Sequence, residues 1–135
     1  MLIFWGCGNS VSTDKSDKDS ITTKPLVSVY YLHQKKSCMT CKAVGSVSKT
    51  TTEDNFSKEI KEGKVAFIDL DISDPVNSSI ADKFECSWAG LYIYSLKNGK
   101  ESAVDLTDVG FMYAVNNPDS LKQVIISTIS EKLQN

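Results

Sequence analysis

The sequence predicts one α/β domain, in the order β-α-β-α-β-β-α, with a mixed central sheet flanked by helices. Segments rich in β-branched and aromatic residues alternate with segments whose apolar residues recur at helical spacing. The pair Asn98-Gly99 separates the last two strand-like segments, which is a strong hairpin signal. About 110 residues, 25–135, follow a polar amino-terminal stretch. A chain of that length can bury a core without disulfide bonds.

The first half of this domain is predicted to run strand, helix, strand, with strands over residues 26–32 and 64–72 and a helix over 39–53 that continues over 55–62. Both strands are rich in β-branched or aromatic residues, and Pro25 precedes the first. The first helix has apolar side chains near helical spacing, although Gly45 weakens it. Its continuation presents Phe56 and Ile60 on one face and ends at Gly63, a residue type common at helix ends.

The second half is predicted to run helix, strand, strand, helix, over residues 76–85, 91–97, 100–106 and from 117 onward. Asp74 and Asn117 each stand just before a proline, a cap-and-proline signal for a helix start. The last helix carries an apolar stripe, which we expect to pack on the sheet. The stripe consists of Leu121, Val124, Ile125, Ile129 and Leu133. The hairpin makes one end of the sheet antiparallel, while the earlier crossovers favour parallel or mixed pairing.

The composition restricts the function. The chain is 41% hydrophobic and 24% charged, with a formal net charge of −2. This balance argues against a nucleic-acid-binding surface, which needs a basic face. No apolar run approaches the roughly 18 residues needed to cross a bilayer. We expect a monomer.

Cys38 and Cys41 form a CxxC motif between the first predicted strand and the first predicted helix. Two cysteines at this spacing can form a disulfide, and the positive end of the helix favours a thiolate on the first of them. We therefore expect Cys38 to be the exposed nucleophile and Cys41 the buried resolving thiol of a thiol–disulfide redox site. The supporting residues are expected to be Lys35 and Lys36, whose charges stabilise the thiolate, with Met39 and Thr40 between the cysteines.

From Pro25 onward the sequence resembles the thioredoxin superfamily. VSVYYLHQKKSCMTC is similar to the superfamily's entry from strand to CxxC, and LYIYSLKNGK to its third strand and turn. The resemblance implies a thioredoxin-like fold and an oxidoreductase or electron-transfer role with a protein thiol or disulfide partner. The Tyr-Tyr strand, the Cys-x-Thr-Cys motif and the Lys-Asn-Gly-Lys turn resemble, more narrowly, a bacterial family found near arsenic-resistance genes. That family is described as a nitrophenyl compound nitroreductase subunit, but nothing in this sequence resembles a flavin site.

Three departures from the superfamily put general disulfide reductase activity in doubt. The superfamily has a cis-proline just before the third strand, beside the sulfurs, and aligning the turns puts Leu91 in its place. Leu32 lies near the place of the buried acid that helps to deprotonate the resolving thiol. Ser37 replaces the aromatic residue before the first cysteine.

Two other functions stay open. Without the proline ring, Cu(I) or As(III) can reach the two thiolates, with His33 or Met39 as a further ligand, which describes a metal or metalloid carrier. The domain can also be a non-catalytic interaction module. Cys86 is expected to be a buried inert thiol or a third redox thiol. Trp88, in the same predicted loop, shields the sulfurs, contacts a partner or packs in the core.

Residues 1–24 are predicted to be a leader remnant and a disordered tether. The apolar stub MLIFWG runs into Cys7, and a stretch of almost only small, polar and charged residues follows. This resembles the lipobox end of a bacterial lipoprotein signal, although the basic start is missing. The resemblance implies lipidation at Cys7 and a place in the bacterial cell envelope, in the periplasm or at the surface. A cytoplasmic location is the alternative.

Overall fold

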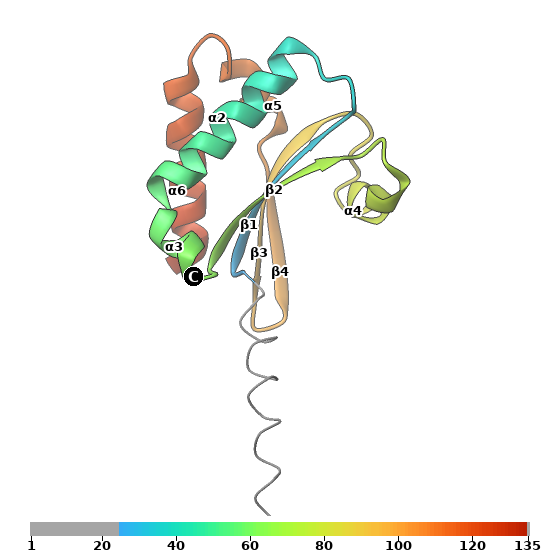
Figure 1. Ribbon diagram of the computed structural model, residues 1–135. Helices are drawn as coiled ribbons and strands as arrows, with labels where there is room; N and C mark the ends of the chain where they lie inside the picture. Colours follow the sequence, from blue (N-terminus) through green and yellow to red (C-terminus); the bar gives the residue numbers. More distant parts are fainter. Residues whose placement is uncertain (1–24, 135) are drawn as a thin grey trace, which may run out of the picture.

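A computed structural model describes residues 25–134, so the predicted leader, the tether and Cys7 lie outside the described residues. It shows a four-stranded mixed sheet with helices on both faces, which confirms the α/β prediction (Figure 1). The strands are β1 (Val27–His33), β2 (Val65–Asp71), β3 (Gly90–Lys97) and β4 (Lys100–Asp105). The helices are α2 (Met39–Asn55), α3 (Ser57–Lys61), η1 (Pro75–Asn77), α4 (Ser78–Lys83), α5 (Thr107–Tyr113) and α6 (Pro118–Gln134).

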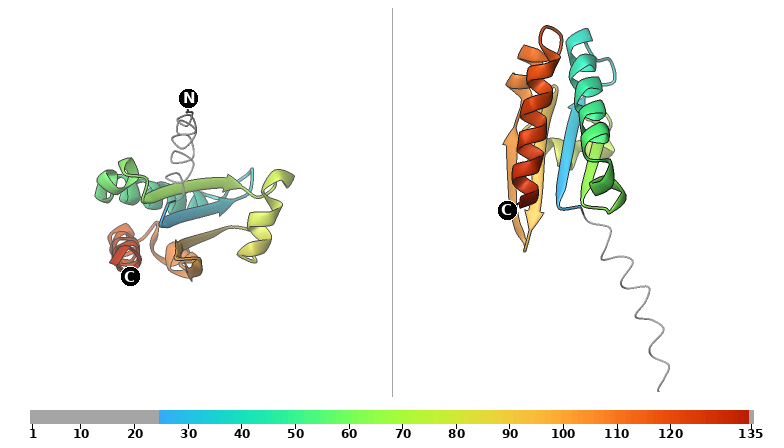
Figure 2. Two further views of the ribbon diagram at one scale, coloured as in Figure 1. Left: turned by 90° about the horizontal axis from the view of Figure 1, so that it is seen from below. Right: turned by 90° about the vertical axis from the view of Figure 1, so that its left-hand side faces the viewer.

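The strands lie in the order β2-β1-β3-β4, with β1 parallel to β2 and antiparallel to β3. The β3–β4 pair is the predicted antiparallel hairpin. Its turn residues Asn98 and Gly99 both have positive φ, 53° and 78°, as a tight two-residue hairpin turn requires. The chain enters β1 at the hairpin end of the sheet and leaves it toward α2 at the other end (Figure 2).

The helices differ from the prediction in three details. Residues 39–55 form one continuous helix that includes Gly45, where the ring of Tyr31 occupies the space that a side chain would need. The helix after Asp74 starts as the short 3-10 turn η1, whose Val76 N–H donates to the Asp74 carboxylate at 3.1 Å. Helix α5 was not predicted. None of the helices within residues 25–134 is both long and apolar enough to cross a membrane.

The side chains of the central strands alternate between two hydrophobic clusters. The larger cluster lies between the sheet and helices α2, α5 and α6, and includes Tyr31, Leu91 and Ile125. The smaller lies under α4 and is built around Leu32 and Tyr92. Helices α2 and α6 run side by side over the larger cluster (Figure 2). The end of β1 and the start of α2 therefore meet at one edge of the larger core.

Candidate redox site at the start of α2

Cys38 and Cys41 form a disulfide at the amino-terminal end of α2, with their Cα atoms 5.1 Å apart. Cys38 is the N-cap residue of the helix and has extended backbone, with φ −75° and ψ 168°. Its Sγ accepts a hydrogen bond of 3.1 Å from the Cys41 N–H. Because the first N–H groups of a helix lack partners within the helix, this sulfur lies where negative charge is stabilised.

The two cysteines differ in exposure. Cys38 is exposed to solvent, whereas Cys41 is only 3% exposed and is among the buried residues of α2. This is the arrangement expected of an attacking and a resolving thiol. The roles themselves stay predictions.

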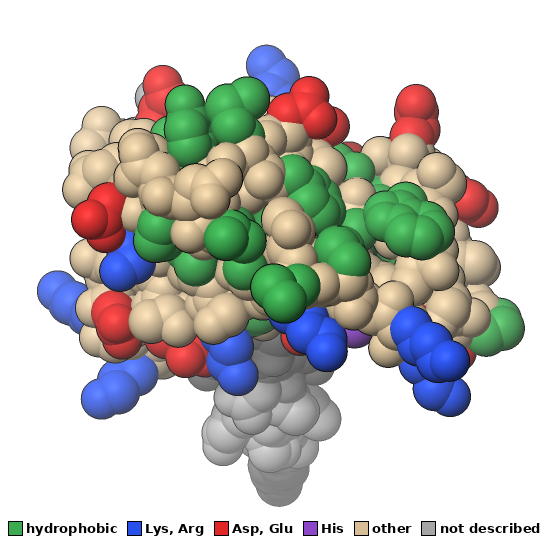
Figure 3. All heavy atoms as spheres, turned by 90° about the horizontal axis from the view of Figure 1, so that it is seen from above, with side chains coloured by type: hydrophobic (Ala, Val, Ile, Leu, Met, Phe, Trp, Pro, Cys, Tyr) green, Lys and Arg blue, Asp and Glu red, His purple; other side chains and the backbone are tan. Residues whose placement is uncertain are grey.

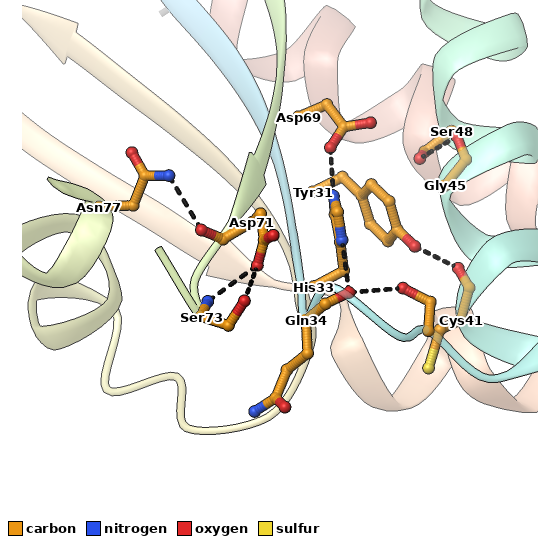
Figure 4. A network of polar contacts seen from close by, with 11 residues as sticks. Tyr31, His33, Gln34, Cys41, Gly45, Ser48, Asp69, Asp71, Ser73 and Asn77 are labelled. Carbon is orange, nitrogen blue, oxygen red and sulfur yellow. Dashed lines mark hydrogen bonds and ion pairs between the residues drawn. The ribbon is translucent and has the colours of Figure 1, made fainter. Parts of the chain in front are cut away.

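Tyr31, which sequence reasoning missed, fixes the backbone of the buried cysteine. Its hydroxyl donates a 2.6 Å hydrogen bond to the Cys41 carbonyl, and its ring lies against Gly45 one turn further along α2 (Figure 4). Burial raises the pKa of Tyr31, although a hydrogen bond with Ser37 opposes the shift. The hydroxyl therefore stays protonated as a donor at neutral pH. The signal available in the sequence was the glycine in the middle of a helix.

A small hollow lies beside the disulfide. Its lining residues come from the loop after β1, the start of α2 and the loop before β3: Gln34, Lys36, Ser37, Cys38, Cys41, Trp88 and Ala89. Gln34 Nε2 donates a 3.2 Å hydrogen bond to the Ser87 carbonyl, which links the two loops. Trp88 is 62% exposed, so it is available to a partner and is not a core residue.

The other supporting residues are divided between two places. Lys36 lines the hollow beside Cys38, while Lys35 lines a separate groove on the far side of Ser37. Met39 is 80% exposed at the start of α2, and Thr40 is half-buried.

Leu91, which the alignment with the superfamily puts in the place of the cis-proline, does not line the hollow beside the sulfurs. Leu91 is fully buried inside β3, opposite Tyr31 of β1. Its N–H donates to Thr107 Oγ1 at 3.1 Å and its carbonyl accepts from the Leu106 N–H at 2.8 Å. Because β3 starts at Gly90, Leu91 already belongs to the sheet, and Trp88 and Ala89 are the residues of that segment that line the hollow. Every peptide bond described between residues 25 and 134 is trans.

His33 faces Asp69 and not the cysteines. Its Nε2 pairs with the Asp69 carboxylate on β2, its Nδ1 contacts the Gln34 carbonyl at 3.0 Å, and its ring stacks on Tyr31 (Figure 4). Partial burial lowers the pKa of His33, but the bonds to Gln34 and Asp69 and the charges of Asp69 and Asp71 outweigh it, so the pKa is raised. Within the described part of the chain, no three His, Cys, Asp or Glu side chains gather as a metal-binding group.

Cys86 is a buried free thiol in the smaller cluster, with Leu32 and Tyr92. Burial raises the pKa of Tyr92 to about 12, a hydrogen bond with Thr107 opposes the shift, and the neighbouring Cys86 adds to it. Leu32 pairs in register with Leu70 of β2, so the place where the superfamily has a buried acid is apolar on both strands.

No protein-family profile matches the chain, and neither does any curated protein.

Proposed function

We propose that this protein is a thiol–disulfide redox protein of thioredoxin-like architecture, which exchanges electrons with a protein partner through Cys38 and Cys41. One observation carries the proposal. The two sulfurs are bonded at the start of a 17-residue helix, with Cys38 open to solvent and Cys41 buried.

The chemistry is a pair of exchange steps in which atoms and electrons balance. In the reduced protein, the Cys38 thiolate attacks one sulfur of the partner's disulfide, so that a mixed disulfide forms and the partner's other sulfur leaves as a thiolate and takes a proton. The Cys41 thiolate then attacks Cys38 Sγ, closes the intramolecular disulfide and releases the partner's second thiol. Two electrons pass to the partner, and the reverse sequence oxidises it.

The surroundings of Cys38 favour its role as nucleophile. The Cys41 N–H already donates to this sulfur, and the positive end of α2 and the neighbouring Lys36 add positive potential. These features lie at the start of α2, whereas Cys86 is buried in the smaller cluster. Cys86 is therefore proposed to take no part in the exchange.

The fold and the surface support the remaining parts of the proposal. The order β2-β1-β3-β4, with the motif between the first strand and the first long helix, is compatible with a thioredoxin-like architecture. The end of the molecule where α2 begins carries exposed hydrophobic side chains, which Figure 3 shows from above. The exposed large hydrophobic residues include Met39, which follows Cys38, and Trp88, which lines the hollow beside the disulfide, together with Met112 and Val115. A protein partner can cover such a surface.

The test compares three single variants in the reduction of a fluorogenic disulfide peptide. Cys38→Ser is expected to abolish exchange. Cys41→Ser is expected to accumulate a mixed disulfide, visible as an added peptide mass, because nothing resolves it. Cys86→Ser is the matched control and is expected to react at the wild-type rate. Exchange by Cys38→Ser at the wild-type rate would reject the proposal.

A further inference from the structure

A groove of about 490 Å³ with charged side chains in its lining runs between α2 and the β1–β2 edge of the sheet, separate from the hollow beside the disulfide. Tyr31, His33 and Asp69 form its sheet side. Its helix side is a stripe at positions 42, 45, 46 and 49, which share one face of α2. Gly45 lets the helix approach the sheet closely at this point, because a Cβ there would lie 2.6 Å from Tyr31 Cζ.

The charge of the groove is unbalanced. Three lysines line it, Lys35, Lys42 and Lys49, and within residues 25–134 none of them pairs with a carboxylate. The lining contains one carboxylate, Asp69, which is held by His33. Because the chain as a whole carries a formal charge of −2, this positive potential is local. Anionic ligands are therefore favoured here.

The groove adjoins the redox pair on both sides in sequence. Ser37 precedes Cys38 and Lys42 follows Cys41, and both line the groove. Tyr31 forms part of its wall and also binds the Cys41 carbonyl. A ligand that fills the groove consequently lies beside a molecule that reacts at Cys38.

The shape and spacing favour an extended polypeptide over a small molecule. Small-ligand pockets enclose most of their ligand, whereas this groove is open to solvent and carries charged side chains on both of its sides. Lys42 and Lys49 are seven residues apart on the helix, which corresponds to about 10 Å along its axis. About three residues of extended chain span that length. Two acidic side chains two to four residues apart in a peptide can therefore reach both lysines.

We infer that this groove binds an acidic segment that flanks the reactive disulfide of the partner protein. The inference rests on the proposed redox function and adds the class of substrate: polypeptide disulfides with Asp or Glu close by. Charge pairs of this exposed kind act mainly on encounter rate and partner choice, and salt screens them.

The test uses two synthetic peptides that contain the same disulfide, one with Glu at two flanking positions and one with Gln there. The readout is the ratio of their exchange rates with the reduced full-length protein. At low ionic strength the Glu peptide is expected to react about tenfold faster, and the ratio is expected to fall toward one in roughly 0.5 M NaCl. The variant K42E/K49E is expected to remove or invert the preference.

A matched control separates the groove from net charge. The variant K58E/K61E makes the same charge change on exposed residues of α3, outside the groove, and is expected to keep the preference. Equal rates for both peptides at low salt would overturn the inference while leaving the redox proposal intact. A preference that K42E/K49E retains, or that K58E/K61E also loses, would overturn it as well. If neither peptide exchanges, the redox proposal fails and takes the inference with it.

Discussion

The two faces of the sheet bury very different numbers of residues. Thirteen buried residues form the cluster on the side of α2, α5 and α6, whereas three form the cluster under α4. The aromatic rings on the α4 side stack or meet edge to edge, as Phe84 does with Tyr92 at 4.7 Å and with Tyr94 at 6.1 Å. Cys41 belongs to neither cluster, but it is buried at the start of α2, the helix that packs over the larger one. The candidate redox pair is therefore carried by the side of the sheet with the larger core.

The largest expected difference comes from truncating one core residue on each side. Ile125→Ala, on α6, removes a fully buried side chain from the larger cluster and is expected to cost about 3 kcal/mol of unfolding free energy. Phe84→Leu, in the half-buried aromatic stack under α4, is expected to cost about 1 kcal/mol. Urea unfolding of the oxidised proteins measures both values. Equal losses of unfolding free energy in the two variants would mean that the two clusters contribute equally to stability.

A smaller effect is expected where α2 touches the sheet. Gly45→Ala places a methyl group against the Tyr31 ring, which must then move away from the Cys41 carbonyl, at an expected cost of about 2 kcal/mol. Gly110→Ala on α5 is the matched control, because its new Cβ would lie 3.3 Å from a Val44 methyl group. The control is expected to change stability by less than about 1 kcal/mol. If Gly45→Ala and Gly110→Ala had equal unfolding free energies, the Tyr31 ring would move aside without destabilising the fold, which would contradict this prediction.

The hydroxyl of Tyr31 can be tested against its neighbour on the other face. Tyr31→Phe removes the hydrogen bond to the Cys41 carbonyl and is expected to cost about 1 kcal/mol and to shift the reduction potential of the pair. Tyr30→Phe, in the aromatic cluster under α4, is expected to cost less than about 0.5 kcal/mol and to leave the potential unchanged. A shift in potential of the same size in both variants would contradict a specific role for Tyr31.

The smallest expected effect is a dependence on pH from His33, the single histidine of the chain. Its folded-state pKa is raised, because the contacts with Gln34, Asp69 and Asp71 outweigh the opposing effect of burial. The contribution of His33 to the unfolding free energy is therefore complete below its unfolded pKa of about 6.5. It is lost as the pH rises through the higher pKa of the folded state. His33→Asn is expected to flatten the pH dependence of the unfolding free energy between about pH 6 and 8, as measured by urea unfolding at each pH. Identical pH profiles would show that the pair with Asp69 does not stabilise the fold.

The sequence predicted what depends on local patterns. The four strands, the long first and last helices, the hairpin turn and the cap at Asp74 all have signals within a few residues. Helix α5 was missed, because its N-cap residue is Leu106, which provides no side-chain cap. The nearby signal was Asp105, whose carboxylate accepts from the Thr107 N–H at 2.9 Å.

The surroundings of the motif were harder to predict because they depend on tertiary contacts. The exposure of Cys38 and the burial of Cys41 followed from their place at a helix start. The bond from Tyr31 to Cys41 spans ten residues, and the groove combines a helical stripe with two strands. Leu91, aligned with the cis-proline of the superfamily, is paired inside β3, and the residues of that segment that line the hollow are Trp88 and Ala89.

The direction of β1 has a practical consequence for attaching the molecule to a surface. The strand runs from Val27 to His33, which separates its first residue from its last by about 20 Å, and the disulfide follows its far end. A support or label joined on the amino-terminal side of Val27 therefore lies across the length of the sheet from the sulfurs. Immobilised in this way, for example on an electrode or a chip, the domain presents Cys38 outward.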